Sequence, residues 1–322
     1  MPPPPDRDGP RAIGIDIGGT KIAAGVVTAA GQILDRTRLL TPPVDESATL
    51  AALFEVVDGL RDRDPSVEAI GVGAAGLVEW PHGNARWAPH NSYRRMELRR
   101  LLHERTGLPT VVDNDANAAA WAEARFGAGA GGGDLVLVTV GTGIGGGLVL
   151  DGRLYHGEQG FAGELGHLIV APDGDRCACG NSGCLEAMAS GSTLGRLGRE
   201  AAAADPGGRL AAIAAAAGAP VTGEVVFAAA LEGDPVALSL FERIGHWLGV
   251  GIASLVTIFD PDLVVVGGGV AATGDLLLAP ARASFDRYVH GRGHRELAPI
   301  VPTRLGDDAG LVGAASLALG CG

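Results

Sequence analysis

The sequence predicts an α/β fold of two lobes, each built from mixed strands and helices. The chain has 322 residues, which corresponds to about two domains at ~150 residues per domain. Runs of β-branched residues alternate with segments of helical periodicity in both halves. Each half also opens on a strand, a glycine turn and a second strand, at Gly18-Gly19 and at Gly141 to Gly143, which indicates a weak internal duplication.

In the first half, apolar runs and glycine stops define the predicted elements. Strand, glycine turn and strand are expected over residues 11–27, followed by strands over 32–40, 67–78 and 110–112. Helices are expected over 49–61, 96–106 and 116–126, where apolar residues recur at helical spacing. Gly107 and Gly127 follow the last two helices as C-terminal stop signals. The glycine-rich segment 127–133 then predicts a hinge or a boundary.

The second half repeats the order of strand, turn and strand and then becomes mainly helical. Strands are expected over 135–140, 148–150 and 263–266, and helices within 192–232 and over 236–259 and 309–319. The longest nonpolar run, 247–259, is too short to span a bilayer, which needs about 20 residues. The N-terminus lacks a secretory apolar segment, so we expect a soluble, cytoplasmic protein with no membrane partner.

The composition excludes several classes of protein. A hydrophobic content of 47% with 19% charged residues excludes a disordered chain. The 25 basic and 37 acidic residues give a net charge of −12, which disfavours a nucleic-acid partner because the surface repels phosphate. Only one basic residue is a lysine, Lys21, and it lies inside a glycine motif.

Two glycine hairpins predict contacts with phosphate. The first, Asp16-Ile-Gly18-Gly19-Thr20-Lys21, supplies an acid for Mg²⁺, two glycines for close approach, a hydroxyl and a cation. The second contributes Thr142 and Gly143. Its pattern Gly141-x-Gly143-x-x-Gly146 matches a dinucleotide fingerprint, but a strand follows instead of the required helix, so a nicotinamide site is rejected. Tight turns without a ligand are the alternative for each hairpin.

Three of the four cysteines crowd into eight positions, at Cys177, Cys179 and Cys184. With His167 ten residues upstream, they form a Cys₃His set that predicts a closed tetrahedral zinc site. Four protein ligands leave no position for a catalytic water, so the zinc is expected to be structural. Buried free thiols or a redox disulfide are the alternative.

Carboxylates and amides gather at three further places. Asp113-Asn114-Asp115 precedes a predicted helix, whose N-cap needs one of the three and leaves two for another role. Glu164 and His167 are three residues apart in a glycine-flanked turn, so their side chains are expected on one side of it. Glu186 lies two residues after the last thiol of the cluster, where the zinc loop would anchor it.

These motifs together resemble the ROK family (repressors, uncharacterised frames and sugar kinases), and within it the glucokinases. The matching stretches run from about residue 12 to the C-terminus: Asp16 to Lys21, Asn114-Asp-Ala-Asn117, Gly163-Glu-Leu-Gly-His167, Cys177-Ala-Cys-Gly-Asn-Ser-Gly-Cys-Leu-Glu186 and Asp260-Pro-Asp-Leu-Val-Val-Val-Gly-Gly-Gly-Val270. The cysteine signature with its upstream Glu-x-Gly-His is the most specific part. The resemblance implies a two-lobed actin-like ATPase fold, related to ribonuclease H, with a central cleft.

The resemblance also implies roles for individual residues in phosphorylating glucose at its 6-hydroxyl with ATP and Mg²⁺. Asp115 would be the catalytic base. Carboxylate, amide and backbone groups suited to a ring of hydroxyls would bind the sugar: Gly76, Asn114, Asp115, Glu164, His167 and Glu186. The ATP phosphates would face Asp16, Gly18, Gly19, Thr20, Lys21, Thr142 and Gly143, and the adenosine would face Gly267, Gly268 and Gly269.

We therefore expect a cytoplasmic, glycolytic glucokinase that assembles as a dimer or tetramer. Its expected parts are a disordered tail over 1–11, a small lobe over 12–126 and about 305–322, and a large lobe with the zinc loop over 127–304. Kinases for N-acetylmannosamine, fructose or allose are alternatives, since residues 88–93 read Ala-Pro-His-Asn-Ser-Tyr where many of these glucokinases have Ala-Pro-Asn-Leu-x-Trp. Polyphosphate as donor and a non-catalytic sugar sensor are further alternatives. A DNA-binding repressor is disfavoured, because too few residues precede the first strand for a helix-turn-helix.

Overall fold

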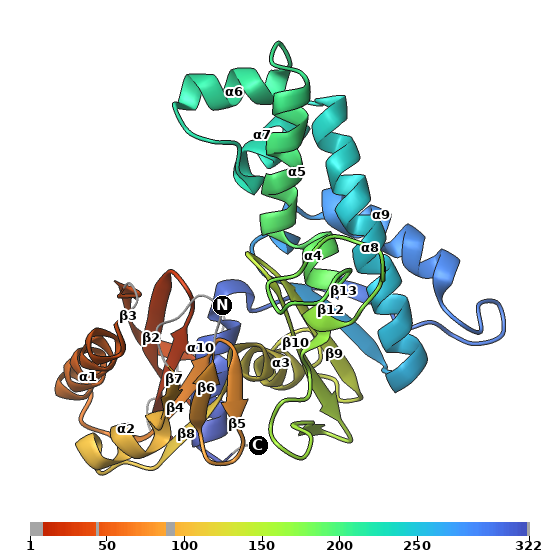
Figure 1. The fold of residues 1–322 in the computed structure, drawn as a ribbon. Coiled ribbons are helices and arrows are strands. Elements are labelled where there is room, and N and C mark those ends of the chain that lie inside the picture. The colour runs from red at the N-terminus through yellow and green to blue at the C-terminus, as the bar shows by residue number, and fades with distance from the viewer. Residues whose placement is uncertain (1–8, 43–44, 88–93, 321–322) are drawn as a thin grey trace, which may run out of the picture. The chain divides into compact units, whose positions relative to one another are not determined.

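The computed structural model describes residues 9–42, 45–87 and 94–320 (Figure 1). Most of the predicted tail, residues 88–93 and Cys321 lie outside this described part. Contacts divide the chain into two compact units. Unit 1 takes residues 1–137, 147–163 and 303–322, and unit 2 takes residues 138–146 and 164–302. The expected division therefore differs at 127–137 and 147–163, which lie in unit 1.

Unit 1 is centred on a five-stranded sheet with the order β3-β2-β1-β4-β8. Its strands are β1 (Arg11–Ile17), β2 (Lys21–Thr28), β3 (Ile33–Leu40), β4 (Val67–Ala74) and β8 (Thr110–Asn114). β1 pairs antiparallel with β2 through the first glycine hairpin, and it pairs parallel with β4 on its other edge. β4 in turn pairs parallel with β8. This order places the ends of β1, β4 and β8, where the predicted site residues lie, at one edge of the sheet.

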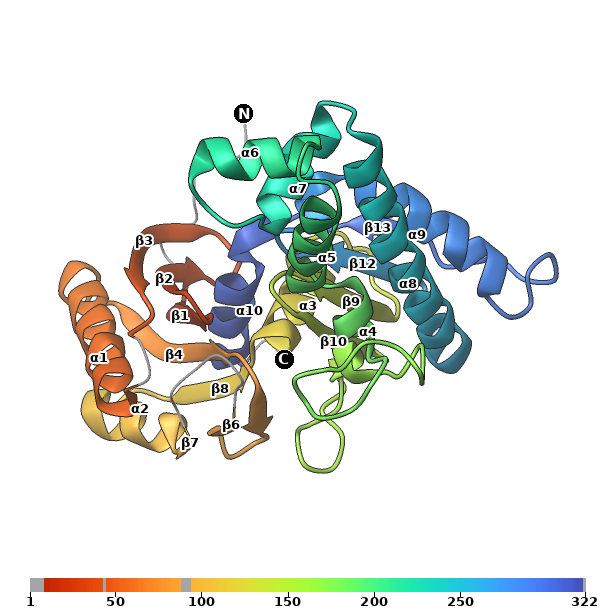
Figure 2. The same cartoon turned by 45° about the horizontal axis from the view of Figure 1, so that its top comes forward.

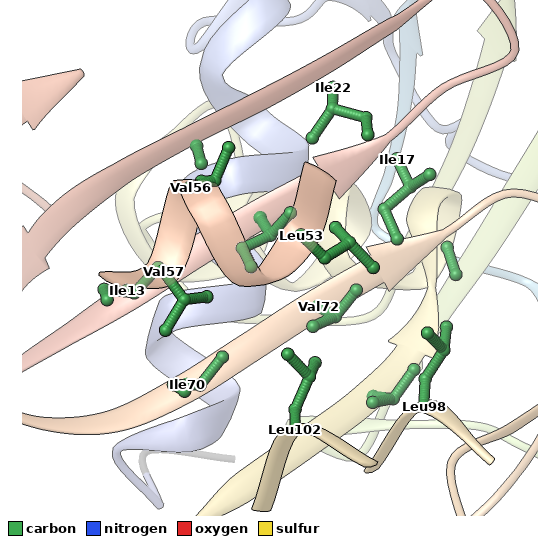
Figure 3. Close-up of a cluster of buried hydrophobic side chains, with 14 of the residues drawn as sticks. Ile13, Ile17, Ile22, Leu53, Val56, Val57, Ile70, Val72, Leu98 and Leu102 are labelled. Carbon is green, nitrogen blue, oxygen red and sulfur yellow. The ribbon is translucent and has the colours of Figure 1, made fainter. Parts of the chain in front are cut away.

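The two faces of this sheet are covered in different ways. On one face, isoleucines of β1 and apolar residues of β4 form one core with residues of α1 (Glu46–Arg63) and α2 (Leu98–Thr106), and Figure 3 shows Leu102 of α2 beside Ile70 and Val72 of β4. On the other face, α10 (Ala309–Ala318) lies so close that a Cβ at Gly14 would be 2.0 Å from the carbonyl oxygen of Leu311. Isoleucine alternates with smaller residues along β1, so one face has a side-chain core, while Gly14 lets α10 approach the other face closely.

The remaining elements of unit 1 lie around that sheet. The strands β5 (Leu77–Glu79), β6 (Asn84–Trp87) and β7 (Arg94–Met96) form a small antiparallel sheet. The helix α3 (Asp115–Phe126) follows β8 directly and packs against α10. A Cβ at Gly313 of α10 would lie 1.7 Å from the Ala118 carbonyl oxygen, so glycine lets these two helices touch.

A second five-stranded sheet has the order β11-β10-β9-β12-β13. Its strands are β9 (Leu135–Val140), β10 (Ile144–Leu150), β11 (Arg153–Leu154), β12 (Leu263–Gly267) and β13 (Ile300–Pro302). The helices of unit 2 are α4 (Leu185–Ala189), α5 (Gly191–Ala204), α6 (Arg209–Ala217), α7 (Gly223–Leu231), α8 (Pro235–Phe259) and α9 (Asp275–Tyr288). In Figure 2, α8 and α9 lie side by side and α5 lies beside α7. No helix in the described ranges is long and apolar enough to cross a membrane.

The structure corrects the sequence analysis at a few elements. The strand predicted over 67–78 is two strands, because the chain turns at Gly76 with a φ of +93° before β5 begins. The helix predicted over 96–106 begins at Leu98, after the short strand β7. The helices α4 and α9 and the strands β6, β7, β11 and β13 were not predicted. The strands have two to four residues and α4 has five, too few to show a period, and α9 contains a proline, Pro280, which a helix interior usually lacks.

Candidate active site

The first glycine hairpin joins β1 to β2 in unit 1. The amide of Gly18 donates to the carbonyl of Lys21 at 3.0 Å, and the hydroxyl of Thr41 donates to the carbonyl of Gly18 at 2.8 Å. Gly19 and Thr20 are exposed at the tip. The hairpin is therefore held from behind, and its tip presents a backbone and a hydroxyl to the solvent, as a phosphate-binding turn requires.

Lys21 has a partner that the sequence did not indicate. Its ammonium lies 2.9 Å from Asp307 Oδ2, and both side chains are exposed. This contact keeps the pKa of Asp307 below its usual value, because the carboxylate accepts a hydrogen bond from a cation. The only sequence signal for Asp307 was its place in the pair Asp307-Asp308, just before the last helix.

Asp16, at the end of β1, is a carboxyl with a strongly raised pKa. Burial raises its pKa from 3.8 to about 7, with further increases from Asp115 and Asp307 and an opposing effect of Lys21. Its carboxyl lies against the first turn of α10, where a Cβ at Gly310 would be 2.9 Å from Asp16 Cγ. A partly buried carboxyl next to other acids is a group that a divalent cation would stabilise in its ionised form.

Asn114 and Asp115 stand at the junction of β8 and α3. Asn114 is the N-cap of α3: its Oδ1 accepts from the amides of Ala116 at 2.8 Å and Asn117 at 3.1 Å. Its Nδ2 donates to the carbonyl of Gly76 at 3.0 Å. The sequence prediction that one residue of the acidic triplet serves as the cap is confirmed, and the cap also fixes Gly76.

Asp115 is half-buried in the first turn of α3. Burial raises its pKa, and Asp113 adds to the rise, while hydrogen bonds, including one from the amide of Ala116, oppose it. A carboxylate with a raised pKa is a stronger base than an ordinary aspartate. The structure thus brings Asp16, Gly76, Asn114 and Asp115 to one edge of the sheet of unit 1.

In unit 2, the predicted Cys₃His set forms one cluster. The ligand atoms of His167, Cys177, Cys179 and Cys184 all lie within 4.8 Å of one another. Cys179 Sγ is 3.6 Å from Cys184 Sγ, and Cys177 Sγ is 3.7 Å from His167 Nδ1. Because a tetrahedral zinc with Zn–S bonds of about 2.3 Å separates its sulfurs by about 3.8 Å, the spacing suits zinc.

The chemistry of the cluster agrees with that spacing. The three cysteines are free thiols, which excludes a disulfide among them in this structure. Burial and the neighbouring thiols raise the pKa of Cys184 to about 12. Crowded thiols of this kind ionise readily only when a cation compensates them, so the donor set fits a bound Zn²⁺.

Glu164 and Glu186 flank this cluster. His167 Nε2 lies 3.9 Å from Glu164 Oε2, on the ring edge opposite Nδ1, as the shared turn predicted. Glu186, in α4, accepts from the amide of Ile144 at 3.0 Å, and its other oxygen is 3.7 Å from Cys177 Sγ. One carboxylate therefore ties the cysteine cluster to the turn between β9 and β10.

That turn and a second glycine stretch complete the predicted residues of unit 2. Thr142 is exposed, and a Cβ at Gly143 would lie 2.3 Å from Glu186 Oε2, so a larger residue there would displace the carboxylate from its present position. Gly267 ends β12, and Gly268 turns with a φ of +87° against the backbone of Val140. Gly269 has open space around its Cα and is exposed. Both turns expose backbone that a flat or anionic ligand can approach.

Comparison with known proteins identifies the family to which these motifs belong. The sequence profile of the ROK family matches residues 12–320. The chain belongs to the ROK family. This match confirms the resemblance that the motifs indicated. The fold and the candidate site can therefore be compared with those of other ROK proteins.

The relatives of this ROK protein include curated glucokinases. The glucokinase of Streptomyces coelicolor is 42% identical over 308 residues, covering 95% of this chain and 96% of the relative. The glucokinase of Halalkalibacterium halodurans is 38% identical, covering 94% and 92%. A crystal structure of the ROK glucokinase from Streptomyces griseus in complex with glucose and AMPPNP matches with a TM-score of 0.86 and 43% identity, covering 96% of this chain and 99% of that one. These matches confirm the two-lobed actin-like ATPase fold class.

Proposed function

We propose that this ROK protein is a glucokinase that transfers the γ-phosphoryl group of ATP to the 6-hydroxyl of glucose. The observation that carries the proposal is Asp115, a half-buried carboxylate with a raised pKa, set beside the helix cap Asn114. The similarity to glucokinases over nearly the whole chain, and to a structure that holds glucose and AMPPNP, supports the substrates.

In this proposal, Asp115 accepts the proton of the 6-hydroxyl while that oxygen attacks the γ-phosphorus and ADP leaves. The other sugar hydroxyls bind to the carbonyl of Gly76, the amide of Asn114, and the side chains of Glu164, His167 and Glu186. Such groups recognise hydroxyls through charge-assisted hydrogen bonds. With His167 Nδ1 on the cysteine side of the ring, its Nε2 is left to face the sugar.

The ATP phosphates are proposed to contact the two glycine turns: Gly18, Gly19, Thr20 and Lys21 in the first, Thr142 and Gly143 in the second. Gly267, Gly268 and Gly269 would face the adenosine. Asp16 would hold Mg²⁺, which neutralises charge on the phosphates during transfer. His167, Cys177, Cys179 and Cys184 would hold a structural Zn²⁺ that stabilises the loop carrying Glu186.

The test is ADP release measured with a panel of sugars under ATP and Mg²⁺. Glucose should give the highest kcat/KM, above N-acetylmannosamine, fructose and allose. A preference for N-acetylmannosamine would reassign the substrate, and binding of glucose without ADP release would support a sensor instead. Replacing ATP by polyphosphate tests the donor, and sedimentation of the same preparation tests the expected dimer or tetramer.

A further inference from the structure

A histidine outside the predicted site contacts the acidic triplet of unit 1. His156 lies just after β11, and its Nε2 is 2.7 Å from Asp113 Oδ2. The side chains are almost completely buried, 11% exposed for His156 and 2% for Asp113. The imidazole ring stacks on Trp80, with ring centres 4.1 Å apart and planes within 3° of parallel. The stacking on Trp80 fixes the plane of the imidazole ring, and the contact with Asp113 fixes the direction in which Nε2 points.

The loop that carries His156 is closely packed against Trp80. A Cβ at Gly160 would lie 2.3 Å from the amide nitrogen of Trp80, so the loop reaches this position only with glycine there. The amide of Ala162 donates to the carbonyl of His156 at 3.0 Å, which closes the loop on itself. The orientation of the imidazole is thus built into two segments that are distant in sequence.

The other oxygen of Asp113 holds the residues on both sides of Asp115. Asp113 Oδ1 accepts from the amide of Asn114 at 2.7 Å and from Nδ2 of Asn117 at 3.0 Å. A buried carboxylate is stable only when donors satisfy both of its oxygens. His156 supplies the donor for Asp113 Oδ2. Asp113 Oδ1 therefore remains available to accept hydrogen bonds from Asn114 and Asn117 at the start of α3.

We propose that His156 is a positioning residue that acts through Asp113 to hold Asp115 and Asn114 in their reactive geometry. The proposal deepens the glucokinase function and rests on it. Without the imidazole N–H, Asp113 Oδ2 becomes a buried acceptor with no donor, and the carboxylate is expected to turn toward one. Asn114 and Asn117 then lose a shared anchor, and Asp115, which lies between them, loses its fixed direction.

The test uses variants that separate the donor from the ring. His156→Phe keeps the stacked ring and removes the N–H. His156→Gln places an amide N–H near the position of Nε2, whereas His156→Asn carries the same amide on a side chain too short to reach Asp113. Ser316→Ala is the control, because it removes a buried hydrogen bond from Trp121 on α3, 3.1 Å long, without touching the acidic triplet.

We expect kcat to fall about 10-fold or more in His156→Phe and His156→Asn, because a misplacement of about 1 Å can cost about 100-fold in rate. In His156→Gln, which keeps the N–H, we expect kcat to stay within about threefold of wild type. KM for ATP should not change in any of them. The control should lower the thermal midpoint and leave kcat unchanged. Folding of each variant is verified by circular dichroism and the thermal midpoint.

Two results would overturn the inference. One is a wild-type kcat in folded His156→Phe, or in His156→Asn should the phenylalanine variant not fold. The other is an equal loss in His156→Gln and His156→Asn, which would mean that packing and not the N–H is required. Absence of glucose-dependent ADP release in the wild-type protein would instead reject the proposed function, before any variant is compared.

Discussion

Replacing Asp16 with asparagine should stabilise the protein while it removes activity. The change keeps the shape of the side chain and removes its charge. In the folded chain, burial first and the neighbouring carboxylates second raise the pKa of Asp16 from 3.8 to about 7. The unfolded chain releases this proton near its ordinary pKa. Between about pH 4 and pH 7 the folded chain therefore holds more protons, and its stability falls as the pH rises.

The size of the effect follows from the shift of about 3 pH units, which at ~1.4 kcal/mol per unit corresponds to about 4 kcal/mol as an upper value. Because Asp16 is only partly buried, solvent screening reduces this, and we expect about 2 kcal/mol. In Mg²⁺-free buffer, Asp16→Asn should thus be more stable than wild type by about 2 kcal/mol at pH 8, with the difference vanishing near pH 4.

Urea unfolding at a series of pH values measures this difference. Asp286→Asn, which changes an exposed carboxylate, is the control and should follow wild type at every pH. Addition of Mg²⁺ and ATP should stabilise the wild type and not the variant, since the ionised carboxylate is the proposed ligand. A stability difference that is independent of pH, or a variant less stable than wild type at pH 8, would refute the account of Asp16.

Four further predictions concern the site and its surroundings. Asp115→Asn should lower kcat about 10²–10⁴-fold and leave glucose binding measurable by calorimetry, because the amide cannot accept the proton; a near-native kcat would make Asp115 a structural residue. Cys177→Ala or Cys184→Ala should remove one zinc per chain by metal analysis and weaken glucose binding, and active protein without zinc would contradict this. Lys21→Arg should raise KM for ATP and leave KM for glucose unchanged, since the broad guanidinium does not replace a compact ammonium. Asp307→Asn should leave stability unchanged, because exposed ion pairs contribute little, and a large destabilisation would show that the pair is structural.

Local sequence patterns were enough to predict most of the core elements and the chemical groups of the site. Isoleucine alternating with smaller residues along β1 predicted a strand, and the glycines after it predicted its hairpin. The spacing of Cys177, Cys179 and Cys184 predicted a cluster that the structure forms together with His167. These patterns can be recognised from the sequence alone, because each depends on residues within about ten positions of one another.

Contacts between distant residues were decided by the tertiary structure alone. Nothing in the sequence pairs His156 with Asp113, or Lys21 with Asp307, which is 286 residues away. The pKa of Asp16 is raised by burial and by Asp115, which begins α3 directly after β8, so the shift exists only once β1 and β8 belong to one sheet. The residue types determined which chemistry the chain can perform. Folding determined which of those groups share a buried environment, because burial and proximity are properties of the packed chain.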